Sequence, residues 1–69
     1  MEGNSYKFVE LVGTSKISVE DAVQSVLAKA AKSVPNMRWF QIVETRGAIK
    51  DNKVAEWQVT VKVGCRLDE

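Results

Sequence analysis

The sequence predicts an α+β fold: a single β-α-β-β unit in which a three-stranded antiparallel sheet, of order 1-3-2, packs on one helix. Apolar residues with helical spacing occupy positions 19–34, and segments of strand-like alternation lie on both sides of them. A right-handed crossover through the helix makes the first two strands parallel, so the third fits antiparallel between them. No repeat or linker divides residues 1–69, so we expect one domain.

The chain is short, and its 69 residues fall in the range where one hydrophobic core gives only marginal stability. Cys65 is the only cysteine and histidine is absent, which excludes an internal disulfide and a structural zinc site. The content of 45% hydrophobic and 28% charged residues is nevertheless typical of a globular protein. We therefore expect self-association to complete the stability of the fold.

The first strand is expected over residues 6–12. Apolar side chains fall on both of its faces, with Tyr6, Phe8 and Val12 on one and Val9 and Leu11 on the other. Gly13 and the two hydroxyl residues after it then break the pattern. The sequence thus predicts a strand that ends at Val12 and is buried on two sides.

The helix is expected to begin after Ser18, which is a favourable N-cap followed by two carboxylates in the first turn. Pro35 prevents continuation, so the helix should stop near Ser33 or Val34. Its apolar positions follow one helical face: Val19, Ala22, Val23, Val26, Leu27, Ala30, Ala31 and Val34.

A long hairpin follows, with strands over residues 38–49 and 54–67 and a turn centred on Asp51 and Asn52. Strict alternation in the last strand predicts a buried odd-numbered face that comprises Ala55, Trp57, Val59, Val61, Val63, Cys65 and Leu67. Cys65 has no histidine to activate it, so we interpret it as a small buried hydrophobic residue rather than a nucleophile.

The expected register gives Trp39 an unusual neighbourhood. A turn at Asp51 and Asn52 pairs residues whose numbers sum to 103, which places Trp39 opposite Gly64 and Gln58 opposite Thr45. The glycine is expected to leave a face of the indole uncovered, where a second flat ring can stack. Large aromatics also commonly anchor subunit interfaces, so spacing alone leaves two roles open for Trp39.

Four segments resemble the dodecins, a family of small flavin-binding proteins, and together they span almost the whole chain. They are residues 8–15 (FVELVGTS), residues 37–40 (MRWF), Arg46 with Gly47, and residues 57–64 (WQVTVKVG) leading to Arg66 and Leu67. A tryptophan nineteen positions before a glutamine, in so short a chain, is the most distinctive feature. The chain departs from the family pattern at Cys65, where many dodecins have phenylalanine, and at Trp57, where tyrosine or phenylalanine is usual.

The resemblance implies a non-enzymatic shell of twelve subunits, built from trimers, that holds flavins in stacked pairs at two-fold interfaces. Storage, sequestration and photoprotection of FMN, riboflavin or FAD are the implied roles. By the same resemblance, Trp39 stacks on the isoalloxazine ring and Gln58 hydrogen-bonds its polar edge, while Arg46 matches a position near the ligand.

Three points from the residues bear on this implied site. Trp39 and Gln58 lie about 20 Å apart along one sheet, so a site that uses both draws them from different subunits. Strict alternation places Arg46 on the opposite face from Trp39 unless Gly47 allows a bulge or the strand twists beyond the helix. Arg66 shares the face of Trp39 and can meet either a flavin phosphate or a carboxylate such as Asp68 or Glu69.

Other functions are disfavoured. Without histidine, no nucleophile and base are suitably spaced for catalysis, and we expect no metal site because dodecins that bind cations instead of flavin usually lack the stacking tryptophan. A net charge of +1 gives no general case for nucleic acid or membrane, and without a leader or membrane-length apolar run the cytoplasm is expected. The alternative is an oligomeric module for a cation, coenzyme A or single-stranded nucleic acid, or a purely structural assembly.

Overall fold

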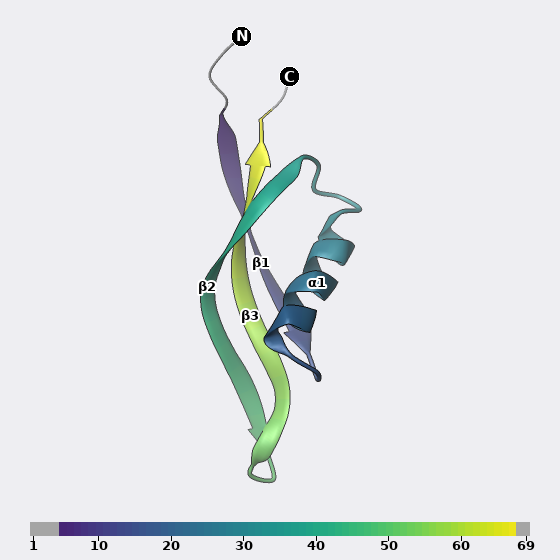
Figure 1. The fold of residues 1–69 in the computed structure, drawn as a ribbon, viewed down its shortest axis with the longest axis vertical. Coiled ribbons are helices and arrows are strands. Elements are labelled where there is room, and N and C mark those ends of the chain that lie inside the picture. The colour runs from purple at the N-terminus through teal and green to yellow at the C-terminus, as the bar shows by residue number, and fades with distance from the viewer. Residues whose placement is uncertain (1–4, 68–69) are drawn as a thin grey trace.

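The computed structural model describes residues 5–67 and contains four elements (Figure 1). They are β1 (Tyr6–Ser15), α1 (Val19–Ala30), β2 (Met37–Lys50) and β3 (Lys53–Arg66). The sheet order is β1-β3-β2, and β3 pairs antiparallel with both neighbours. The expected fold class and strand order are confirmed. No helix in residues 5–67 has the length and apolarity needed to cross a membrane.

Strand β1 continues three residues further than expected, to Ser15. Gly13, Thr14 and Ser15 pair with β3 in an unbroken register, because tertiary pairing overrides the weak strand preference of these residues. Gly13 also allows α1 to approach: a Cβ at this position would lie 2.5 Å from the carbonyl oxygen of Ala22 and 2.9 Å from Cβ of Val26. The glycine is therefore a site of close helix–strand contact, not the end of the strand.

Hydroxyl groups fix the start of α1. Ser18 is the N-cap, as expected, and its Oγ accepts a hydrogen bond from the Asp21 backbone N–H at 3.0 Å. Ser15 Oγ donates to Asp21 Oδ2 at 2.6 Å and accepts from the Ile17 N–H at 2.9 Å. The end of β1 and the first turn of α1 are thus tied together.

The helix ends at Ala30, earlier than the expected Ser33 or Val34. Ser33 and Val34 both donate backbone hydrogen bonds to the Ala30 carbonyl, at 2.9 and 2.8 Å, which closes the chain into a turn. Pro35 disfavours the helical conformation in the residue before it, and Asn36 then adopts a positive φ of 62°. The helix stops one turn early for these reasons.

The core lies between α1 and one face of β3. Its buried members are Ala22, Val23, Val59, Val61, Val63 and Cys65. The prediction of a buried odd-numbered face is confirmed from Val59 to Cys65. Ala55 and Trp57 are only partly buried, and the prediction is wrong for Leu67, which lies beyond β3 and is 49% exposed. We call this side of the sheet the helix-covered face.

The opposite side of the sheet is the open face, and no element of the described chain covers it. Tyr6, Phe8 and Val12 project there from β1 and remain 42%, 54% and 54% exposed. The expected burial of β1 on two sides is therefore not achieved within one chain. An apolar groove also remains on the other side of the sheet, where Phe40 and Ile42 of β2 lie beside Leu27 of α1.

The β2–β3 hairpin extends beyond the helix (Figure 1) and turns at Asp51 and Asn52, as expected. Both turn residues have positive φ angles, 54° and 64°, which match the right-handed twist of the flanking strands. Three irregularities interrupt the ladder: Arg38 and Val43 are extra residues in β2, and Ala55 is an extra residue in β3. The bulge at Ala55 cancels the register shift of the bulge at Val43.

Candidate functional site

Aromatic side chains gather at one end of the open face, which we call the aromatic end (Tyr6, Phe8, Trp39). The Trp39 ring lies 4.8 Å from the Tyr6 ring and 6.1 Å from the Phe8 ring, measured between centroids. Both contacts are edge-to-face, with interplanar angles of 65° and 81°. This geometry is favourable for aromatic pairs, so the neighbours hold the indole in place.

Gly64 lies opposite Trp39, as the register predicted, but with a different consequence. A Cβ on Gly64 would lie 2.4 Å from Cε2 and Cζ2 of the indole. The space left by the missing side chain is therefore filled by the Trp39 ring itself. Trp39 remains 43% exposed, which leaves the part of the ring away from Gly64 accessible to a ligand.

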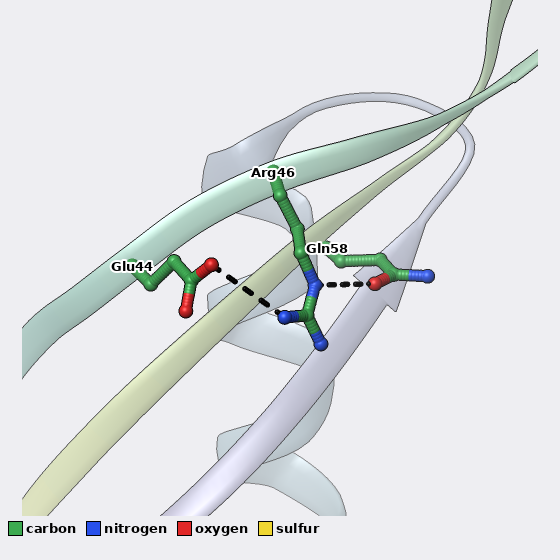
Figure 2. A network of polar contacts seen from close by, with 3 residues as sticks. All are labelled: Glu44, Arg46 and Gln58. Atoms are coloured by element: carbon green, nitrogen blue, oxygen red, sulfur yellow. Dashed lines mark hydrogen bonds and ion pairs between the residues drawn. The ribbon is translucent and has the colours of Figure 1, made fainter.

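Polar side chains form a connected network at the other end of the open face, which we call the polar end (Glu44, Arg46, Glu56, Gln58; Figure 2 draws three of them). Arg46 Nε donates to Gln58 Oε1 at 2.8 Å, and Gln58 Nε2 donates to Glu56 Oε2 at 3.1 Å. Arg46 Nη1 also lies 3.5 Å from Glu44 Oε2.

The bulge at Val43 creates this network. After it, residue numbers of paired positions sum to 104, so Gln58 lies opposite Arg46 instead of the expected Thr45. The extra residue also reverses the alternation of β2, which brings Arg46 to the face of Trp39. The expectation that strict alternation places Arg46 on the opposite face is thus wrong, and the bulge lies at Val43, three residues before Arg46, instead of at Gly47.

Arg66 lies at the aromatic end, where it pairs with Tyr6 across β1 and β3. Its backbone N–H donates to the Asn36 carbonyl at 2.9 Å. Its suggested carboxylate partners, Asp68 and Glu69, lie outside the described residues.

The two ends do not meet within one chain. Gly64, beneath Trp39, and Gln58 are six residues apart on β3, which corresponds to about 20 Å of strand. The structure therefore brings Arg46 to Gln58, and Arg66 to the side of the sheet that bears Trp39, but it does not bring Trp39 to Gln58. A flat ligand that contacts both residues needs a second chain.

Sequence reasoning missed the part that Glu56 plays in the polar end. Glu56 and Gln58 are two residues apart on β3, and side chains two residues apart on a strand lie on the same face. This spacing was the signal that could have placed Glu56 beside Gln58. Within residues 5–67, no three of the side chains that commonly bind metals (His, Cys, Asp, Glu) are grouped for an ion. The site as described offers stacking surface at one end and oriented hydrogen-bonding groups at the other.

The family model for dodecin matches residues 5–68. The chain belongs to the dodecin family. The dodecin family is not named for an enzymatic activity.

A dodecin from Thermus thermophilus is 48% identical over 67 residues, which cover 97% of both chains. Among solved structures, the dodecin from Streptomyces davaonensis has a TM-score of 0.92 at 41% identity and covers 99% of this chain and 100% of its own. The dodecin from Streptomyces coelicolor has a TM-score of 0.92 at 39% identity and covers 100% of this chain and 99% of its own. The likeness thus extends over the whole dodecin fold, and no large insertion separates these proteins.

Proposed function

We propose that this dodecin binds flavin (FMN, riboflavin or FAD) without turnover, as a store that also limits the photochemistry of the cofactor. The binding unit in this proposal is a pair of subunits in a closed assembly of about twelve. The observation that carries the proposal is the bipartite open face, with an accessible tryptophan at one end and an oriented glutamine amide at the other.

A two-fold axis joins the two ends most simply. Residues 58 and 64 are equidistant from Val61 on β3, so an axis near Val61 would bring Trp39 of one copy close to Gln58 of the other. A two-fold interface places the same surface on both subunits, and two equivalent sites follow from it. The exposed Tyr6, Phe8 and Val12 would be covered in the same contact, which supplies apolar burial that the short chain lacks.

Each end contributes a different property to the proposed site. Trp39 supplies stacking area, worth about 1–3 kcal/mol per ring in comparable base-on-aromatic contacts. Gln58 supplies neutral hydrogen bonds, worth roughly 0.5–1.5 kcal/mol each. An excited flavin in contact with an electron-rich indole is also quenched by rapid electron transfer, so Trp39 accounts for both sequestration and protection.

Fluorescence titration of riboflavin tests the proposal. The parent protein should darken the flavin on binding, Trp39→Ala should lose most of the affinity and leave any bound flavin bright, and Gln58→Ala should weaken binding while bound flavin stays dark. Light scattering should give a mass near twelve subunits for all three proteins at micromolar concentration. A Trp39→Ala protein that is still assembled, binds riboflavin as tightly as the parent and quenches it equally would refute the site.

The same aromatic end, with Lys62 Nζ 5.5 Å from the Phe8 ring centroid, has the composition of a single-strand nucleic-acid surface. A labelled oligothymidine titrated under the same conditions distinguishes the two functions. We expect no binding to the assembled protein, because the two-fold contact would cover this surface.

A further inference from the structure

Gln58 lies between two neighbours of opposite hydrogen-bonding character. A guanidinium only donates hydrogen bonds, and an ionised carboxylate only accepts them. Arg46 therefore requires the amide oxygen at its 2.8 Å contact, and Glu56 requires the amide nitrogen at its 3.1 Å contact. Figure 2 shows the amide nitrogen directed away from Arg46.

Only one of the two amide orientations satisfies both neighbours. If the amide turned by 180°, its NH₂ group would face the Arg46 donor and its oxygen would face the Glu56 carboxylate, so both hydrogen bonds would be lost. A side chain that is already ordered before binding loses less conformational entropy when a ligand arrives. Arg46 and Glu56 therefore fix the direction in which Gln58 presents its two atoms.

The two contacts also determine what remains for a ligand. A glutamine amide has two N–H donors and two oxygen lone pairs. Arg46 takes one lone pair and Glu56 takes one N–H, which leaves one acceptor on the oxygen and one donor on the nitrogen of the same amide. A cyclic imide, in which an N–H adjoins a carbonyl, is the group that matches such a pair of atoms in one plane.

We propose that Arg46 and Glu56 are positioning residues that lock the Gln58 amide into a donor–acceptor pair specific for an imide edge. The proposal rests on the flavin site proposed above, because the pyrimidine part of isoalloxazine carries such an edge. It gives Arg46 a role that needs no direct ligand contact. It also makes Glu56 a determinant of specificity.

Glu44 provides a matched control. Glu44 Oε2 lies 3.5 Å from Arg46 Nη1, but both side chains of this ion pair are more than half exposed. The pair therefore contributes little free energy to holding Arg46 in place. The amide of Gln58 is held by Arg46 and Glu56, not by Glu44. Glu44→Gln therefore removes the same charge as Glu56→Gln from the same surface without releasing the amide.

The test compares riboflavin with riboflavin methylated at the imide nitrogen, which cannot donate from that position. For the parent, the methylated ligand should bind about tenfold more weakly. Glu56→Gln and Arg46→Gln place a group that both donates and accepts beside the amide, so riboflavin affinity should fall about threefold to tenfold while the methylated ligand changes little. The ratio between the two ligands then approaches one.

Two variants should keep the ratio of the parent. Arg46→Lys retains a neighbour that only donates, and Glu44→Gln leaves both amide contacts in place. The mass of each assembly shows whether a variant still folds, and Arg46→Gln provides the same test if Glu56→Gln does not assemble.

Distinct results overturn the distinct claims. A ratio unchanged in both Glu56→Gln and Arg46→Gln would overturn the positioning role while the flavin site stands. A parent that binds riboflavin and its methylated form equally would overturn imide recognition. A parent that binds no riboflavin would refute the flavin site, and this inference with it.

Discussion

Gly13 and Gly64 lie on opposite faces of the sheet, and at each position another group occupies the space that a Cβ would need. At Gly13 the group is backbone, the Ala22 carbonyl of α1, at 2.5 Å. At Gly64 it is the indole of Trp39, at 2.4 Å. The same residue type thus serves helix packing on one face and the seating of a candidate ligand-binding ring on the other.

The comparison separates what the chain completes by itself from what it leaves to a partner. On the helix-covered face, Val59, Val61 and Val63 are at most 1% exposed. On the open face, Phe8 and Val12 are each 54% exposed. Mutations on the first face should therefore act on folding, and mutations on the second should act on binding and assembly.

Gly13→Ala should have the largest effect, because a helix backbone cannot yield as a side chain can. We expect a loss of about 3 kcal/mol in the free energy of unfolding, the upper end of the cost of overpacking a core. Urea denaturation at matched protein concentration measures it. Gly47→Ala, whose Cβ would lie 3.0 Å from the Glu56 carbonyl and away from α1, should cost less. Equal urea midpoints for the parent and Gly13→Ala would show that the close approach of α1 does not require a glycine at this position.

Gly64→Ala should leave folding nearly intact and weaken flavin binding. The new methyl group must push the indole outward, and a partly exposed ring can move, so the unfolding free energy should change by less than about 1 kcal/mol. We expect about a tenfold loss of riboflavin affinity, within the range for stacking contacts. In a double-mutant cycle with Trp39→Ala, the glycine substitution should have no further effect once the indole is removed. A full additional loss in the double variant would show that Gly64 acts independently of Trp39.

Arg66→Ala should have the smallest effect, and only on a phosphorylated ligand. We expect about a twofold to fivefold loss for FMN at low salt, typical of an exposed ion pair, and little change for riboflavin. The difference should narrow at high ionic strength because exposed charges are screened. Equal losses for the two flavins would remove Arg66 from the site.

The sequence was sufficient to predict the elements and the pairing near Trp39, and insufficient for the polar end. Helical spacing and strand alternation are repeated many times, so single exceptions such as Gly13 do not obscure them. The predicted pairing of Trp39 with Gly64 holds because the bulges at Val43 and Ala55 cancel over the length of the hairpin. Between the bulges the register is shifted, and the predicted partner of Gln58 is wrong there.

Nothing in the local pattern marks Val43 as an inserted residue. Valine suits a regular strand as well as a bulge, and it is 48% exposed in the structure. The contacts of the Gln58 amide depend further on the side-chain conformations of Arg46 and Glu56, which alternation does not determine. Periodicity identifies which residues of a strand share a face only where no bulge lies between them.

The bulge at Val43 has an evolutionary consequence. A substitution at this position alters one side chain, whereas loss or gain of a single codon there would turn Glu44, Arg46 and their neighbours up to the next bulge to the other side of the sheet. We therefore expect dodecin sequences to tolerate many replacements but few insertions or deletions between the tryptophan and the arginine. When the polar end is inferred for a distant relative, the number of residues between the tryptophan and the arginine should therefore be compared first.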